Sequence, residues 1–368
     1  MCPKCFRGLR ILGFVILLSM APLYQVIAMD DFKLETGDRY SKEEINNQFI
    51  RIEEKPYIKA PFLYRLLIPK DWKVVQLENQ PDRLPSDIPI PVAHLATKSD
   101  DGTQMVLLGI SLTREISAAD WLRIYVMGKK YSLLGLKAWS PENADSLVGM
   151  SIAGKEFIGT IAVRIHGNIL LVLVGVSPRG IYDKYREQFG ISAHYFDVVG
   201  SRSKDTIEKR KTYDIQKTVR FQYPESWHPV TFPHPPKGKQ AVDLFWFDVK
   251  EVPQGMIRVK TVVKGVPNRK DDQLKDALDE FTKAGNEMKT LISDNTLSIR
   301  GDRYQSGFQK VYAGKNPEGT PYESWITVVE GEKYYYIVSL LTRERKVDFS
   351  TWAINLRAYQ IVMETMGI

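Results

Sequence analysis

The sequence contains the same landmark twice. In "YRLLIPKDWKVV" a strand-like run ends at Pro69 and is followed by Trp72, and in "VRFQYPESWHPV" a similar run ends at Pro224 and is followed by Trp227. The two prolines and the two tryptophans are both 155 residues apart (224 − 69 and 227 − 72). A chain of 368 residues, 43% of them hydrophobic, is long enough for two domains of about 100–200 residues each. The spacing therefore indicates two halves built on one plan.

The order of the elements expected after each tryptophan is also the same. Apolar and β-branched runs predict a strand, a hairpin and a second strand, with turns at 99–102 and around 253–255. A helix follows in each half, at 117–134 and at 271–292, and the first begins with Ser117 in a variant of the capping box. The second helix has apolar residues at helical spacing along one face: Leu274, Ala277, Phe281, Ala284, Met288 and Leu291.

Each half closes with several antiparallel strands and a last helix, and the final hairpins turn at 167–168 and at 330–331. The sequence thus predicts an α+β fold of two tandem α/β/α-sandwich-like domains. Each has an antiparallel sheet, a long central helix and a C-terminal helix. The predicted boundaries are 60–200 for the first domain, 201–214 for a polar linker and 215–368 for the second domain.

The repeated landmark has a structural interpretation and a functional alternative. Pro69 and Pro224 end the preceding strands, because proline has no N–H for the ladder. Trp72 and Trp227 then cover one end of the core, where an aromatic side chain buries a large area. The alternative is a pair of exposed tryptophans that bind a ligand ring.

This order of elements resembles the PsbP/Mog1/DcrB-like fold, a family of α/β sandwiches. The resemblance covers about 60–200 and again 215–368, and it depends on the Pro-x-x-Trp landmark and the element order. It implies a tandem pair of binding or assembly modules without catalysis. It assigns no functional residue, because no motif of the family marks one in this sequence.

The first 28 residues have the pattern of a secretory signal peptide. Lys4, Arg7 and Arg10 precede an apolar run, which ends in Val26-Ile27-Ala28. We therefore expect cleavage after Ala28 and a periplasmic or secreted product. The alternative is an uncleaved anchor, because the run approaches the ~20 residues that span a bilayer. In that case the segment would be the only membrane contact.

Removal of this segment changes the chemistry of the chain. Cys2 and Cys5 are its only cysteines, so the mature protein would have no thiol. Loss of its three basic residues lowers the net charge from +7 to +4, and we expect no nucleic-acid partner. Residues 29–59 form a polar leader in which Ser41 and Glu44 predict a short capped helix. This leader is either a docking arm or a disordered tail.

The densest basic run lies within the predicted linker. It is "KDTIEKRKT", with Lys204, Lys209, Arg210 and Lys211. Such a run can contact an anionic partner, but between domains it more often forms a solvated connection. We interpret it as part of the linker.

No residue pattern predicts a catalytic, cofactor or metal site. "GMSIAG" around Ser151 differs from a nucleophile elbow, because Ala153 stands where glycine is required. The five histidines are His94, His166, His194, His228 and His234. Only His228 and His234 form a close pair, and Asp243 is the nearest carboxylate beyond them. A metal site needs three or four ligands. The acid pairs Asp100-Asp101 and Asp271-Asp272 fit a turn and a helix start.

Two classes of function remain. The first is a non-catalytic envelope protein that binds other envelope proteins and helps to assemble or stabilise a complex. The second is a hydrolase or small-ligand-binding protein with a site between the two domains. An exposed apolar patch would favour the first, and a concave pocket with converging polar groups would favour the second.

Overall fold

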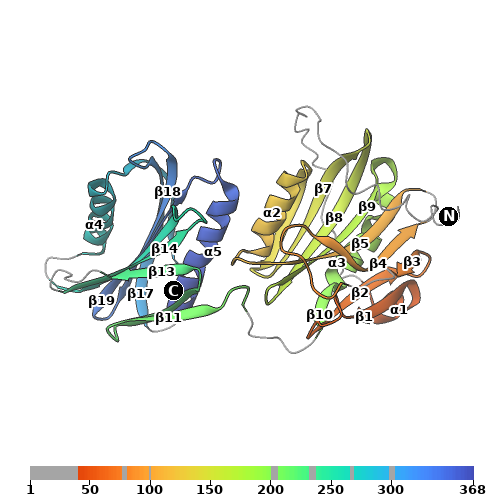
Figure 1. Cartoon of the computed structure of the whole chain (residues 1–368), viewed down its shortest axis with the longest axis horizontal. Coiled ribbons are helices and arrows are strands. Elements are labelled where there is room, and N and C mark those ends of the chain that lie inside the picture. The colour runs from red at the N-terminus through yellow and green to blue at the C-terminus, as the bar shows by residue number, and fades with distance from the viewer. Residues whose placement is uncertain are drawn as a thin grey trace, which may run out of the picture. The chain divides into compact units, whose positions relative to one another are not determined.

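Two seven-stranded antiparallel sheets dominate the fold (Figure 1). The first has the order β3 (Lys73–Gln76), β4 (Ile90–Lys98), β5 (Thr103–Ser111), β9 (Ile169–Pro178), β8 (Lys155–His166), β7 (Asn143–Ile152), β6 (Ser132–Ser140). The second has the order β13 (Trp227–Thr231), β14 (Lys239–Phe247), β15 (Pro253–Val263), β19 (Tyr334–Arg343), β18 (Pro321–Gly331), β17 (Tyr304–Lys315), β16 (Glu287–Thr296). Raising each strand number of the first order by ten gives the second, so the repetition extends to the strand topology.

The computed structural model describes residues 40–76, 81–98, 101–199, 206–231, 238–265, 269–297 and 303–368. All of them belong to one compact unit. The expected signal peptide lies outside these residues. Within the described part of the chain, no helix is long and apolar enough to cross a membrane.

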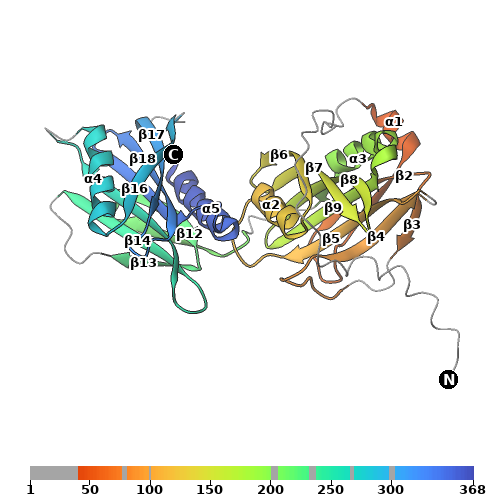
Figure 2. The ribbon, with the colours of Figure 1, turned by 90° about the horizontal axis from the view of Figure 1, so that it is seen from above.

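Each sheet has one helix on either face (Figure 2). The four helices are α2 (Ala118–Gly128) and α3 (Tyr182–Tyr195) on the first sheet, and α4 (Lys270–Lys283) and α5 (Phe349–Met366) on the second. In β8, Thr160 contacts Tyr182 of α3, whereas its neighbour Ile161 joins the buried cluster that includes α2. In β18, Ile326 packs with α4, and Thr327 bonds Tyr359 of α5. This alternation follows from the two-residue period of a strand.

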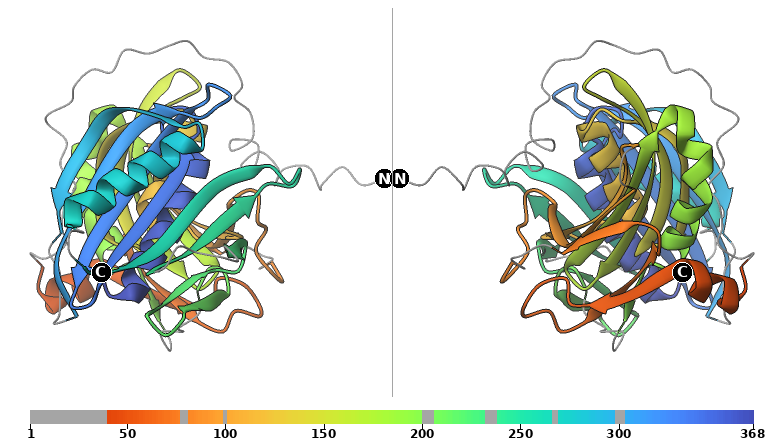
Figure 3. Two further views of the ribbon diagram at one scale, coloured as in Figure 1. Left: turned by 90° about the vertical axis from the view of Figure 1, so that its left-hand side faces the viewer. Right: turned by 90° about the vertical axis from the view of Figure 1, so that its right-hand side faces the viewer.

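A small sheet packs against each of α3 and α5. The orange strands of the first small sheet and the green strands of the second can be followed in Figure 3. The first consists of β1 (Phe49–Glu54), β2 (Leu63–Pro69) and β10 (Asp197–Val199), and the second of β11 (Arg210–Ile215) and β12 (Val219–Pro224). Ile191 of α3 packs with Phe49 and Leu67. The backbone N–H of Gln222 donates to Thr365 Oγ1 of α5 at 2.9 Å. Each C-terminal helix therefore lies between a large and a small sheet.

The repeated landmark has the structural role predicted for it. Pro69 is the last residue of β2 and Pro224 is the last residue of β12. Trp72 and Trp227 are buried, at 4% and 1% exposure. The Trp72 indole meets Tyr185 and Phe189 of α3 edge to face, and its Nε1 donates to Gln188 Oε1 at 3.1 Å. Burial rules out the alternative in which these rings bind a ligand.

The two central helices are shorter than predicted. The backbone N–H of Asp120 donates to Ser117 Oγ at 3.1 Å, as expected for a cap, but α2 ends at Gly128 and β6 begins at Ser132. Likewise α4 ends at Lys283, and Met288 and Leu291 belong to β16. Lys130 and Gly285 adopt positive φ of 57° and 84°, which turns the chain out of each helix.

Part of the polar leader belongs to the folded structure. The interpretation of the leader as a disordered tail is therefore wrong for the residues of α1 and β1. The helix α1 (Lys42–Gln48) has the predicted capping box of Ser41 and Glu44. It leads into β1, which pairs with β2 along its whole length. Ile45 and Phe49 are buried because they face Leu67 and Ile191.

Two further boundaries also differ from the prediction. The second part of the expected linker is strand β11, whose residues Arg210–Ile215 pair with β12. The turn expected at 253–255 lies before Pro253, where the Asp248 carboxylate accepts the backbone N–H groups of Lys250 and Val252. The turn forms at Asp248 and not at the predicted position, because the Asp248 side chain accepts hydrogen bonds from those amides.

Candidate functional site

The serine motif noted in the sequence does not form a nucleophile elbow. Ser151 lies near the end of β7, and Ala153 and Gly154 make the turn into β8 with positive φ of 49° and 78°. A nucleophile elbow requires a strand followed by a helix, whereas this segment is a hairpin. The predicted β-turn before Phe157 is therefore present.

The histidines lie in four separate elements. His94 is in β4, His166 contacts the ring of Phe62 at the end of β8, His194 contacts Tyr195 in α3, and His228 contacts Phe247. His234 lies outside the described residues. Among the residues that the structure describes, no three histidine, cysteine or acidic side chains are grouped in a way that could hold a metal ion.

The acidic and basic runs noted in the sequence have local partners. Asp101 accepts the Tyr185 hydroxyl and the Thr103 backbone N–H, and Asp272 accepts the Arg269 backbone N–H at the start of α4. Lys211 pairs with Glu225 at 3.4 Å. Lys204 lies outside the described part of the chain.

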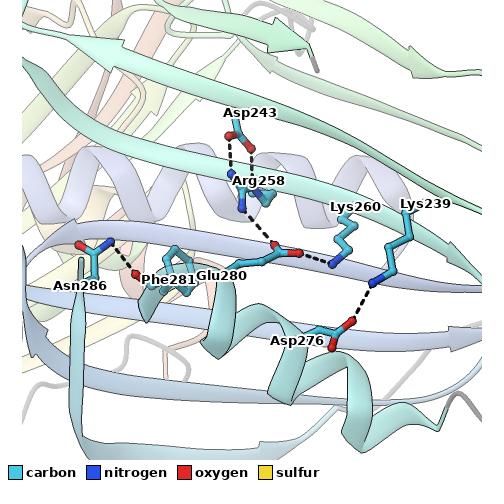
Figure 4. A network of polar contacts seen from close by, with 8 residues as sticks. All are labelled: Lys239, Asp243, Arg258, Lys260, Asp276, Glu280, Phe281 and Asn286. Atoms are coloured by element: carbon cyan, nitrogen blue, oxygen red, sulfur yellow. Dashed lines mark hydrogen bonds and ion pairs between the residues drawn. The ribbon is translucent and has the colours of Figure 1, made fainter. Parts of the chain in front are cut away.

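A polar network attaches α4 to the second sheet (Figure 4). Glu280 of α4 accepts from Lys260 at 2.7 Å and from Arg258 at 3.1 Å, and Arg258 also holds Asp243 through two bonds of 2.7 Å. One turn earlier in α4, Asp276 accepts a hydrogen bond from Lys239, which lowers the pKa of that carboxyl group. Asp243, the first carboxylate after the histidine pair in the sequence, thus pairs with Arg258. We therefore give this network a structural role, the attachment of α4 to the sheet.

The outermost strands β6 and β16 are the long edges of the two sheets. They have 9 and 10 residues, whereas the opposite edges β3 and β13 have 4 and 5, and β13 contains Pro229. Short strands and proline are two devices that protect a sheet edge from pairing with another chain. Register shifts interrupt β6 near both ends and leave the stretch Leu136–Ala138 regular.

An exposed and firmly held tryptophan marks the β6 edge. Trp139 is 47% exposed, and its Nε1 donates to Asp145 Oδ2 at 2.6 Å. The ammonium of Lys137 lies 3.5 Å from the centroid of the indole ring. Leu133 of the same strand is also exposed, as are Leu291 and Ile292 on the equivalent strand β16. Both long edges therefore present apolar side chains to the solvent.

Asp145 is held in turn by the buried side chain of Arg164. Arg164 Nη1 donates to Asp145 Oδ1 at 2.7 Å. Its Nε donates to the carbonyl of Phe196 at 2.9 Å, and its Nη2 donates to that of Ala193 at 2.8 Å. Arg164 thus connects the end of α3 to the carboxylate that orients Trp139.

Beside this edge lies a cavity of about 590 Å³. The turn Ser140–Asn143 forms part of its wall, and its charged and titratable lining residues are Glu115, Glu142, Arg164, His166, Asp197, Arg210 and Arg357. Glu115 is 3% exposed, and its backbone N–H donates to Glu208 Oε1 at 3.0 Å. Burial raises the pKa of the Glu115 carboxyl group, although the charges of Arg210 and Arg357 act in the opposite direction.

Sequence reasoning missed both the tryptophan edge and the cavity. The helix predicted at 117–134 includes the start of β6, so the sequence pattern does not identify Trp139 as an edge residue. Glu115 precedes a helix cap and matches no motif. The apolar residues that continue after Lys130 are the one sequence signal for strand β6.

No protein-family model and no curated protein matches the sequence. Three similar solved structures are cyanobacterial PsbP from Synechocystis sp. PCC 6803, the Ran-binding protein Mog1p of Saccharomyces cerevisiae, and the T6SS immunity protein TplEi of Pseudomonas aeruginosa. PsbP has 11% identity and a TM-score of 0.31, over 41% of this chain and 92% of that one. Mog1p has 11% identity and a TM-score of 0.30, over 43% and 93%. TplEi has 10% identity and a TM-score of 0.23, over 86% and 96%. The resemblance to PsbP and Mog1p indicated by the sequence is thus also found among solved structures, and it concerns the fold alone.

Proposed function

We propose that the chain is an exported, non-catalytic module that binds another envelope protein and helps to assemble or stabilise a complex. The observation that supports this proposal most directly is the β6 edge with its exposed Trp139. An edge strand offers unpaired N–H and C=O groups, to which an extended segment of a partner adds as a further strand.

Trp139 would anchor such a partner. Tryptophan is enriched among the residues that carry most of the binding energy at protein interfaces. The bond to Asp145 and the contact with Lys137 hold the indole in place before binding, so little side-chain freedom is lost. The regular stretch Leu136–Ala138 supplies the neighbouring backbone.

Site-specific photo-crosslinking in the native envelope tests this proposal. A photoreactive aromatic amino acid at position 139 should give one dominant adduct, identified by mass spectrometry. The same amino acid at Val347, which is 54% exposed in a turn, should give none. Trp139→Ala should weaken co-purification of the crosslinked partner at least tenfold without changing the unfolding midpoint. Equal adducts at both positions would contradict a binding edge.

The export part of the proposal has its own test. Mass spectrometry of the mature protein should find Met29 or a close neighbour as the first residue, because the segment before it has the pattern of a signal peptide. Intact Met1 in the membrane fraction would instead make this segment an anchor.

A further inference from the structure

We propose that the cavity beside the β6–β7 turn binds a small zwitterion of the amino-acid or dipeptide class. This binding is independent of the β6 edge. The volume of about 590 Å³ lies within the range of small-molecule sites, which is about 300–1,000 Å³. The wall carries charges of both signs, and some of these charged groups already have partners within the protein.

Several of these groups have internal partners. Arg164 donates to Asp145 and to backbone carbonyls at the end of α3. Asp197 accepts the backbone N–H of Val198 at 2.8 Å, and Glu142 accepts the Ser140 hydroxyl at 3.0 Å. These residues form the frame of the cavity.

Glu115 and Arg210 differ from this frame. Glu115 Oε1 and Arg210 Nε form an ion pair across 3.5 Å, but both atoms are buried and neither has a hydrogen-bond partner within the described part of the chain. The Glu115 side chain is 4% exposed. A buried polar group without a hydrogen bond is destabilising, because the contacts that it loses with water are not replaced. Both residues line the cavity, so one bound molecule can satisfy both atoms.

Arg357 of α5 completes the charge pattern. Its side chain is 5% exposed, and its Nη1 donates to Glu364 Oε1 at 2.7 Å. Its positive charge acts on the Glu115 carboxyl group together with that of Arg210. Apart from the framing residues, the wall thus presents the Glu115 carboxylate beside the guanidinium groups of Arg210 and Arg357.

This pattern selects a ligand with two charges. An ammonium group would donate to Glu115 Oε1, and a carboxylate would accept from Arg210 and approach Arg357. A simple anion would face the carboxylate of Glu115, and a simple cation would face two arginines. A molecule with both charges avoids either conflict, as free amino acids and dipeptides do.

Calorimetric titration and thermal unfolding of the chain from Met29 to Ile368 test this inference. The probes are glycine, L-alanine and L-alanyl-L-alanine, with acetate and methylammonium as controls that carry one charge each. We expect at least one zwitterion to bind and to raise the melting temperature, and neither control to do so. Two results would overturn the proposal. One is acetate binding as tightly as the zwitterions, and the other is no binding of any zwitterion at concentrations up to about 10 mM.

Matched variants locate the site. Glu115→Gln and Arg357→Lys should each weaken zwitterion binding at least tenfold, whereas Arg179→Lys, in an exposed ion pair with Glu156, should leave it unchanged. Cooperative unfolding measured by circular dichroism shows that each variant is folded. If Glu115→Gln does not fold, Arg357→Lys decides the test by itself. Undiminished binding by either folded cavity variant would place the ligand elsewhere.

Discussion

At the scale of single residues, Arg164 connects separate elements of the first sheet and its helix. Its guanidinium satisfies the carbonyl groups of Ala193 and Phe196, which lie at the end of α3 and have no helical partner. It also neutralises Asp145, which is 7% exposed and accepts from Trp139. One side chain thus connects α3, β7 and the β6 edge.

Arg164→Met should therefore be strongly destabilising. It leaves the Asp145 carboxylate buried without a cation, which costs about 3–5 kcal/mol. Urea unfolding measures this loss. Arg179→Met is the matched control, because its pair with Glu156 is exposed and such pairs contribute about 0–1 kcal/mol. Similar losses in both variants would contradict the role assigned to Arg164.

Glu115 should give the stability of the protein a recognisable pH dependence. Burial raises the pKa of its carboxyl group in the folded state above the ordinary value for glutamate. The folded protein therefore retains this proton better than the unfolded chain does, and the free energy of unfolding falls as the pH rises through the folded pKa.

Glu115→Gln should remove this fall. The difference in unfolding free energy between the parent and the variant should change with pH only above about 4.5, the ordinary pKa of a glutamate carboxyl group. Denaturant unfolding of both proteins at a series of pH values measures the difference. A difference that is constant from acid to neutral pH would show that the burial of Glu115 does not control its protonation.

At the scale of elements, α3 lies against the first sheet through a contact that only glycine permits. A Cβ atom on Gly175 of β9 would lie 2.4 Å from Cδ1 of Phe189. The Phe189 ring is almost fully buried between β9 and Trp72, so it has little room to move. The absence of a side chain at position 175 thus sets how closely α3 approaches the sheet.

Gly175→Ala should destabilise the protein by about 1–3 kcal/mol, because the added methyl group overpacks this contact. Gly180→Ala is the control, since a Cβ atom there meets no other atom within 4 Å. Thermal unfolding of both variants gives the comparison. If Gly175→Ala is as stable as the control, α3 can shift and its position is not determined by this contact.

At the scale of the whole molecule, we propose that each large sheet and its helices form a domain that folds independently. The sequence predicts the boundaries of these domains at 60–200 and 215–368. The matching strand orders and the flanking small sheets support this proposal. One feature counts against it, because the largest cluster of buried apolar residues takes members from both sheets. Glu208 also accepts the backbone N–H groups of both Glu115 and Ser226.

Separate expression of residues 40–199 and 206–368 tests this proposal. These boundaries retain β1 and β11, which pair within their own halves. Each fragment should unfold cooperatively, at a lower temperature than the full chain because the shared apolar surface is exposed. A fragment that folds only when the other is added would show that the two sheets depend on one core.

The sequence alone determined the features that depend on local chemistry. Pro69 and Pro224 end their strands because proline has no N–H, and Ser41 and Glu44 cap α1 because their side chains reach neighbouring amides. The hairpin at 167–168 joins β8 and β9 where two strand patterns meet. The order of elements in the two halves follows from the same short-range signals.

The tertiary structure determined the features for which short-range signals compete, and those that depend on residues far apart in the chain. Met288 and Leu291 continue the helical rhythm of α4, yet they lie in β16 because pairing with β17 outweighs a weak local preference. Arg164 of β8 pairs with Asp145 of the neighbouring strand β7, and Glu115 pairs with Arg210, which lies 95 positions later in the chain (210 − 115). No sequence pattern links such residues, because only the packing of sheets and helices brings their charges together in a site of low solvent access.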